Sequence, residues 1–377
     1  MKRNLWFGIG IILVAALLAI MLIVTQAKKK PEEIKIGAIL PLTGKMAAFG
    51  EAQKWALLLA EEKVNEIGGI KGRKLKFIFE DSKADPKEAV AAINKFINIE
   101  KINIVFAFRS GEISAIQPIT EKAKVLFFAF TAEPEIANRA SYTFQIYPNL
   151  KQINEVMMGF IKQSDAEKIG SIYVMAPATK AFVSQFLTPG IKKMGKQVVI
   201  ETSFEKDDID IRTQALQIKQ AKPEILVTVV HYMFIPMVLK TFKEMGILGK
   251  VDILGSIDYT FEIQAPTELL EGIYFVSPFY VFKTAQHNNI SWFEKTYKDR
   301  HGQYPGYDPA FFFDAATLVA EGLKVHGTDV EKLKNYLLKI RNYQGVSGQI
   351  SIESDKTAKV DLVLGKFEKG KRVLVEK

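Results

Sequence analysis

Short hydrophobic runs alternate with segments of helical periodicity along the chain after Pro31. The first run, IKIGAIL at 34–40, is followed by an amphipathic segment over about 46–65. Further runs that predict strands lie at 74–80, 102–108 and 125–130. Alternation of β-rich runs with helical segments is typical of βα units on a parallel sheet. We therefore predict an α/β fold built on parallel strands.

A second series with the same alternation begins near Ala166. Its predicted strands lie at 168–175, 197–204, 224–230 and 251–256. Amphipathic segments separate these runs, so the chain contains two α/β halves in tandem. The remaining C-terminal part, with a helix predicted over 308–325 and a β-rich tail, is too short for a third domain. We expect it to complete both sheets.

The N-terminus contains a long apolar run. Leu5 to Val24 is free of charge and follows two basic residues. A helix of this length spans the roughly 30 Å core of a bilayer, whereas the apolar part of a secretory signal is usually about 7–15 residues long. We predict that residues 1–30 form an uncleaved membrane anchor or a cleaved signal peptide and that 31–33 are a linker. In either case the rest of the chain is exported, to the periplasm or the cell surface.

The net charge of +9 at neutral pH does not indicate nucleic-acid binding. Five of the basic residues lie in the first 30 positions, and the other charges are mixed in sign along helical segments. Such mixing is typical of a solvated surface rather than of a basic stripe. The chain has no cysteine, which excludes disulfides and thiolate metal sites, and its four histidines lack metal-ligand spacing. We predict no metal, no cofactor and no nucleic-acid partner.

Sequence signatures of common enzyme classes are absent. No Gly-x-Gly-x-x-Gly follows the first predicted strand, and the chain contains neither a phosphate-binding loop nor a Gly-x-Ser-x-Gly elbow. Ser110, His231 and Asp258 are the residue types of a catalytic triad, but the types alone do not indicate one without geometry. We therefore predict that the chain is not an enzyme and has no catalytic residues.

The most specific pattern lies at 64–90, VNEIGGIKGRKLKFIFEDSKADPKEAV. It combines an Asn-x-x-Gly-Gly-Ile-x-Gly-Arg turn, a strand that ends in Asp81, and an Asp-Pro pair before a helix. This arrangement resembles the type I periplasmic solute-binding proteins, in particular the branched-chain amino acid (Leu/Ile/Val) binding family of ABC importers. Weaker similarities follow the order of the family, at 34–50, 210–227, 311–323 and 345–355. Together they cover about residues 34–370.

The resemblance implies a two-lobed type I periplasmic binding protein fold. Each lobe would be a parallel-sheet α/β sandwich, with three crossovers between the lobes and the ligand in the interlobe cleft. We place lobe 1 at 34–146 and 279–344, and lobe 2 at 147–278 and 345–377. The strand pattern supports this position for the ligand independently, because open α/β sheets bind ligands beyond the carboxyl ends of their strands.

The segment RSGEISAIQP at 109–118 aligns with a Ser-Ser-Gly segment of the family. The resemblance implies that the Ser110 hydroxyl and neighbouring amides receive a ligand carboxylate and that Gly111 allows close backbone approach. Helix N-termini favour anions in general. Alternatively, Ser110 only caps the helix. Arg109 replaces a small residue of the family and could clamp a second carboxylate, face solvent or pair with Glu112.

The resemblance implies further ligand-binding positions, namely Phe49, Phe130, Thr131 and Ala132 in the first lobe and Thr179, His231 and Asp258 in the second. Thr131 lies in the loop that corresponds to the second carboxylate-binding loop of the family. Asp258 is the candidate acid for a ligand ammonium. Phe49 and Phe130 could instead belong to the core, and His231 could be a histidine with satisfied hydrogen bonds at a strand end.

The function implied by the resemblance is that of an extracytoplasmic solute-binding component of an ABC importer. Such a protein captures an amino acid or a related small organic carboxylate by hinge closure and delivers it to a membrane permease and its ATPase. The anion-binding segments match the family better than the ammonium-binding ones, so branched-chain specificity does not follow. A membrane-anchored ligand-sensing receptor domain of the same fold is the alternative.

Overall fold

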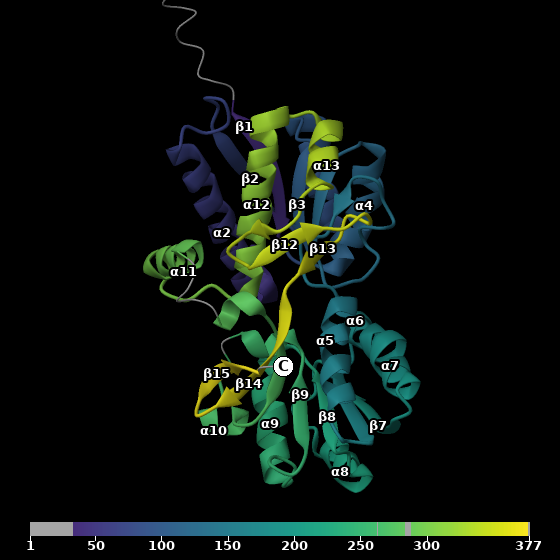
Figure 1. The fold of residues 1–377 in the computed structure, drawn as a ribbon. Coiled ribbons are helices and arrows are strands. Elements are labelled where there is room, and N and C mark those ends of the chain that lie inside the picture. The colour runs from purple at the N-terminus through teal and green to yellow at the C-terminus, as the bar shows by residue number, and fades with distance from the viewer. Residues whose placement is uncertain (1–32, 262, 283–287, 376–377) are drawn as a thin grey trace, which may run out of the picture.

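The computed structural model describes residues 33–261, 263–282 and 288–375, which form two lobes arranged end to end (Figure 1). The apolar run Leu5 to Val24, with its predicted anchor or signal peptide, lies outside these residues. Within the described ranges, no helix combines the length and apolar character needed to cross a membrane.

Lobe 1 is built on a five-stranded parallel sheet with the order β2-β1-β3-β4-β5. Its strands are β1 (Ile34–Leu40), β2 (Leu75–Asp81), β3 (Ile104–Phe108), β4 (Leu126–Phe130) and β5 (Thr143–Phe144). Its helices and short helical turns are η1 (Gly44–Met46), α2 (Ala47–Glu66), α3 (Pro86–Lys95), η2 (Phe96–Glu100), α4 (Ser110–Lys122), α11 (Asn288–His301), α12 (Tyr307–His326) and α13 (Val330–Leu337). The four strands predicted in this half lie within two residues of their observed bounds, because buried parallel strands are continuous hydrophobic runs.

Lobe 2 is built on a seven-stranded sheet with the order β15-β14-β10-β9-β8-β6-β7. Its strands are β6 (Lys168–Val174), β7 (Gln197–Phe204), β8 (Ile225–Val229), β9 (Asp252–Gly255), β10 (Tyr274–Pro278), β14 (Leu362–Glu368) and β15 (Lys371–Leu374). The helices and short helical turns are α5 (Leu150–Gln163), α6 (Pro177–Phe182), η3 (Val183–Leu187), α7 (Thr188–Lys193), α8 (Arg212–Ala221), η4 (Tyr232–Phe234), α9 (Ile235–Glu244), η5 (Ile257–Thr260), α10 (Thr267–Leu270) and η6 (Phe279–Phe282). The strands β6 to β10 are parallel, and β14 and β15 add an antiparallel edge.

The C-terminal tail completes only the second sheet. Its first strands, β11 (Tyr343–Gln344), β12 (Gln349–Ile352) and β13 (Ala358–Val360), form a separate antiparallel sheet. The predicted lobe boundary between 344 and 345 falls inside this sheet. Gln145, which follows β5, pairs with Thr357, and so attaches this sheet to lobe 1. We therefore place the last crossover at Asp361, and the other predicted boundaries stay predictions.

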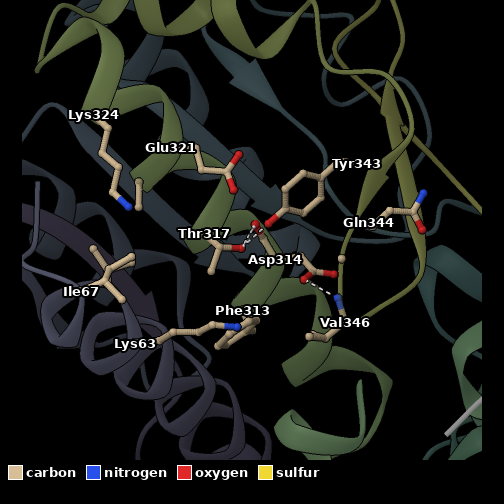
Figure 2. Close-up of a pocket in the computed structure, with 13 residues that line it drawn as sticks. Lys63, Ile67, Phe313, Asp314, Thr317, Glu321, Lys324, Tyr343, Gln344 and Val346 are labelled. Atoms are coloured by element: carbon tan, nitrogen blue, oxygen red, sulfur yellow. Dashed lines mark hydrogen bonds between the residues drawn. The ribbon is translucent and has the colours of Figure 1, made fainter. Parts of the chain in front are cut away.

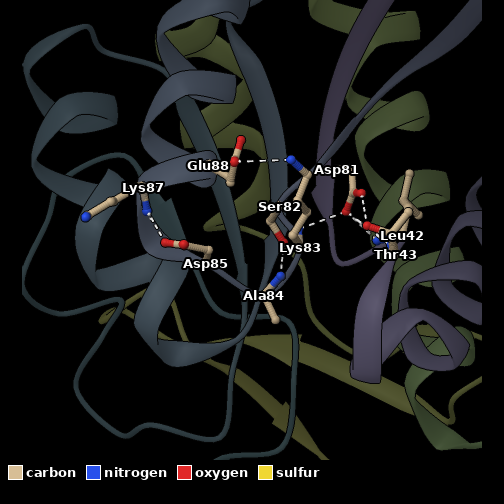
Figure 3. A network of polar contacts seen from close by, with 9 residues as sticks. All are labelled: Leu42, Thr43, Asp81, Ser82, Lys83, Ala84, Asp85, Lys87 and Glu88. Carbon is tan, nitrogen blue, oxygen red and sulfur yellow. Dashed lines mark hydrogen bonds and ion pairs between the residues drawn. The ribbon is translucent and has the colours of Figure 1, made fainter.

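The loop after β1 is fixed by the carboxylate at the end of β2 (Figure 3). Asp81 Oδ1 accepts hydrogen bonds from the backbone amides of Leu42 and Lys83, each at 2.8 Å, and Oδ2 accepts from the Thr43 hydroxyl at 2.5 Å. Burial alone would raise the pKa of Asp81, but these hydrogen bonds hold it below its ordinary value. Gly50 in the first turn of α2 then allows the helix to lie against the loop after β1, since an added Cβ would lie 2.1 Å from the Pro41 carbonyl oxygen. The network therefore positions the first turns of α2 beside lobe 2.

Candidate functional site

The two lobes touch through a set of aromatic rings, Phe49, Phe108, Tyr232, Phe261 and Tyr307, which we call the interlobe seam. Phe49 at the start of α2 packs edge-on against Tyr232 and Phe261 of lobe 2, with ring centroids 5.5 and 5.7 Å apart. Phe261 also meets Tyr307 of α12 at 5.0 Å. Phe108 ends β3 and lies 6.4 Å from Phe49. The seam therefore lies beyond the carboxyl ends of the strands, where ligands of open α/β sheets bind.

Two hydroxyls meet at the lobe 1 side of this region. The Ser110 and Thr131 hydroxyl oxygens are 2.7 Å apart, and Thr131 Oγ1 also accepts from the Glu133 amide at 3.1 Å. Ser110 is the first residue of α4, and Arg109 rather than Ser110 occupies the N-cap position. The hydroxyl pair therefore adjoins the backbone N–H groups of a helix N-terminus, an arrangement suited to an anion.

Arg109 is the residue whose role the sequence leaves open, and the structure pairs it with a buried acid. Its Nε lies 3.5 Å from Glu112 Oε1, and the Glu112 side chain is 2% exposed. Burial raises the pKa of Glu112, and the charge of Arg109 opposes this. Arg109 also has φ +78° and ψ 135°, a backbone conformation that costs a non-glycine residue about 1–3 kcal/mol. Strain of this kind is common at ligand-binding sites.

We expect Arg109→Gly to be more stable than Arg109→Ala by about 1–2 kcal/mol in urea unfolding, because both lose the ion pair with Glu112 but only alanine keeps the strain. At an unstrained helix position such as Lys54 in α2 the order of stability should reverse, with Lys54→Gly less stable than Lys54→Ala by about 1 kcal/mol. Equal stability of the two Arg109 variants would show that the backbone relaxes at this position.

The other predicted positions of lobe 1 differ in their surroundings. Phe49 lies half-buried in the seam. Phe130 is fully buried and stacks on Phe312 with ring centroids 3.6 Å apart, the core role that the sequence leaves open. Ala132 is half-buried next to Thr131. Gly111 is exposed, and an added Cβ would make only an ordinary contact with Pro86.

In lobe 2 the predicted acid is held by its own loop and by the loop that follows β8. Asp258 Oδ1 accepts from the Tyr232 amide at 3.1 Å, and Oδ2 accepts from the Ser256 hydroxyl at 3.3 Å. His231 Nδ1 lies 3.8 Å from Asp258 Oδ1, and the His231 side chain is 45% exposed. Thr179 is buried, and its hydroxyl donates to the backbone carbonyls of Val174 at the end of β6 and of Ala176 at the N-cap of α6. Asp258 and His231 therefore lie together beside the seam, whereas the Thr179 hydroxyl serves local structure.

Sequence reasoning missed a second acid at this place, Asp308 in the first turn of α12. It is 3% exposed, and its Oδ1 accepts from the Tyr147 hydroxyl at 2.5 Å. Burial raises the pKa of Asp308 to about 7, the Tyr147 hydrogen bond opposes this, and the charge of Asp258 adds to it. The available signal is an acid directly before the apolar run 309–313 at the start of the helix predicted over 308–325, and this pattern alone indicates only a helix start.

A separate pocket of about 230 Å³ lies on lobe 1 between α2, α12 and β11 (Figure 2). Asp314 at its floor accepts from the Val346 and Ser347 amides, each at 2.7 Å, and from the Ser347 hydroxyl at 2.5 Å. Burial raises the pKa of Asp314 to about 6 in spite of these bonds. Since its carboxylate holds the loop between β11 and β12, we assign this pocket a structural role.

Comparison with known families agrees with this geometry. A family model described as periplasmic binding protein matches residues 33–372, almost the whole described chain. The chain belongs to the periplasmic binding protein family. This periplasmic binding protein is 22% identical over 361 residues to Leu/Ile/Val-binding protein homolog 7 of Brucella abortus, covering 91% of the chain and 88% of the relative.

Solved structures share its fold. The branched-chain amino acid transporter substrate-binding protein LivJ of Streptococcus pneumoniae, in complex with isoleucine, has a TM-score of 0.79 at 22% identity and covers 91% of this chain and 99% of its own. A solute-binding protein of an ABC transporter from R. palustris, in complex with benzoate, has a TM-score of 0.77 at 19% identity, with coverage of 91% and 96%. These similarities confirm the two-lobed type I fold. The match to the periplasmic binding protein family confirms the prediction that the protein is not an enzyme.

Proposed function

We propose that the chain is the extracytoplasmic solute-binding component of an ABC importer and that it captures an amino acid or a related small organic carboxylate. The observation that carries this proposal is the Ser110–Thr131 hydroxyl pair at the start of α4, 2.7 Å apart beside the seam. A helix N-terminus with two hydroxyls is suited to a carboxylate. Related folds hold isoleucine in LivJ and benzoate in the R. palustris protein, and both ligands carry that group.

Capture would proceed by hinge closure. The open lobes admit the ligand, its contacts to both lobes stabilise the closed form, and a membrane permease with its ATPase recognises that form. Phe49 would act in closure, because its ring already contacts Tyr232 and Phe261 across the seam. We place the protein in the periplasm or at the cell surface, with Leu5 to Val24 as an anchor or a cleaved signal. No finding favours the alternative of a sensing receptor.

Ser110→Ala is expected to weaken carboxylate binding by about 10- to 100-fold, the loss of one hydrogen bond to a charged group. Calorimetry on the full-length protein in mild detergent would measure this with L-leucine, L-isoleucine, succinate and benzoate. Ser184→Ala is the matched control, since Ser184 is exposed on lobe 2 and bonds only to its own helical turn. Unchanged affinity in Ser110→Ala would contradict the carboxylate site.

A further inference from the structure

Asp314 gives the pocket on lobe 1 a structural role, but that role uses only the floor of the pocket. The Asp314 side chain is 1% exposed, and the three hydrogen bonds that its carboxylate accepts all come from the β11–β12 loop. The walls belong to α2, α12 and β11, and they include the side chains of Lys63 and Lys324 (Figure 2). Neither lysine forms a hydrogen bond or an ion pair with a residue that the structure describes, so the loop does not depend on them.

Lys63 of α2 is a half-buried cation without an acceptor among the described residues. Its ammonium group lies over the rings of Trp292 and Phe313, 4.3 and 5.4 Å from their centroids. Burial lowers the pKa of Lys63, and the charge of Asp314 opposes this. An ammonium group has three donors, and burying a charge without hydrogen bonds is unfavourable. An anionic group in the pocket would accept from these donors and compensate the charge.

Lys324 of α12 brings a second cation to the same lining. The acid of the lining that a ligand can meet is Glu321, since Asp314 is buried and bonded to the loop. Glu321 accepts a hydrogen bond from Tyr336, and the charge of Lys324 opposes the rise that burial causes in its pKa. One accessible carboxylate thus stands against two ammonium groups. A single negative charge on a ligand would balance the accessible charges.

The rest of the lining favours an apolar body on that ligand. Val64 and Phe313 belong to the wall, and Ile67, which ends α2, is 70% exposed beside them. Covering an exposed isoleucine next to a pocket is favourable, because it removes apolar surface from water. Pockets for drug-sized ligands are about 300–1,000 Å³. The pocket volume of about 230 Å³ therefore suits a smaller molecule.

We propose that this pocket is a second binding site, on lobe 1 and apart from the interlobe seam, for a small organic anion. The charged group of the anion contacts Lys63 and Lys324, and its apolar body lies against Ile67 and Phe313. None of the five seam residues is among those that line the pocket. The inference goes beyond the proposed function and does not depend on which ligand the seam captures.

Acids and their neutral amides test the site by calorimetry on the full-length protein in mild detergent. The probes are benzoate against benzamide, hexanoate against hexanamide, and acetate, which lacks the apolar body. At least one of the two larger acids should bind at least tenfold more tightly than its amide and than acetate. Lys63→Met and Lys324→Met should each weaken this binding about tenfold, the loss of one charged hydrogen bond. Lys122→Met, at an exposed lysine of α4, is the control, and Ser110→Ala should leave this binding unchanged.

Ile67→Glu tests the same site without altering a buried residue. Ile67 is 70% exposed, so the variant should fold, and its added carboxylate should weaken binding of the acid at least fivefold by repulsion. Ile99→Glu is the matched control, at an isoleucine of lobe 1 that is 72% exposed and does not line the pocket. Both variants carry the same change in charge, so only the position differs.

Trp292 provides an optical readout of the same event. An anion that draws the Lys63 ammonium group away from the Trp292 ring should change the tryptophan emission of the protein. Trp292→Phe keeps an aromatic ring at this position and should lose the change, whereas Trp55→Phe, in α2 but outside the lining, should keep it.

The outcomes separate this site from the seam. If the larger acids bind no more tightly than their amides or acetate, or do not bind, the pocket is not an anion site and the inference fails. It fails also if Ser110→Ala abolishes binding of the acids while Lys63→Met, Lys324→Met and Ile67→Glu retain it. That last result would leave the proposed function standing, because the seam would then be the place where the acids bind.

Discussion

Gly345→Ala is expected to lower the free energy of unfolding by about 3–5 kcal/mol, the range for breaking a buried charged network. An alanine Cβ at this position would lie 2.2 Å from Asp314 Oδ2 and 2.5 Å from Cγ. The carboxylate cannot give way easily, because Val346 and Ser347 hold it with hydrogen bonds of 2.5 to 2.7 Å. Displacing it would leave a buried acid without its donors and detach the β11–β12 loop from α12. Urea unfolding monitored by circular dichroism would measure the loss.

A double-mutant cycle isolates this clash from other effects of the substitution. In an Asp314→Ala background the steric conflict is gone, so adding Gly345→Ala should cost less than about 1 kcal/mol. Gly159→Ala in α5 is the control for a glycine with open space around it, and helix propensity predicts a gain of about 0.5–1 kcal/mol there. An equal cost of Gly345→Ala in both backgrounds would mean that Asp314 is not the conflicting group.

The strands could be predicted from the sequence because their signal is local. The run at 34–40 coincides with β1, since a strand covered on both faces needs consecutive apolar residues. The small sheet of β11 to β13 could not be placed in the same way. Its attachment to lobe 1 depends on the pairing of Gln145 with Thr357 and on Asp314, whose partner amide at Val346 lies 32 positions further along the chain. No local pattern encodes such a pairing.

The site was predictable where its residues follow strands. Ser110 lies two residues after the end of β3, and Thr131 comes directly after the end of β4. Because β3 and β4 are neighbours in the sheet, the order of strands brings the two hydroxyls together. No such rule places Asp308, because its partner Tyr147 is 161 positions away in the chain and Asp258 belongs to the other lobe. Phe130 could be placed from the sequence but its role could not. An aromatic residue at the end of a strand is compatible with the core and with a binding site.

The ligand-free protein is expected to lose stability as the pH rises from about 5 to 7. The pKa of Asp308 is about 7 in the folded protein against an ordinary value of 3.8. Between these values the folded state holds a proton that the unfolded state has lost, so each pH unit lowers stability by up to about 1.4 kcal/mol. Above the folded pKa the loss levels off. Asp314 and Glu294, whose pKa values burial raises to about 6 and 7, act with the same sign.

Urea unfolding at pH 5.5, 6.5, 7.5 and 8.5 would measure this slope. Asp308→Asn should remove up to about 2 kcal/mol of the loss between pH 5.5 and pH 7, because the amide does not ionise. Asp165→Asn, at an exposed acid of lobe 2, should keep the whole slope. An unchanged slope in Asp308→Asn would show that Asp308 does not titrate in this range.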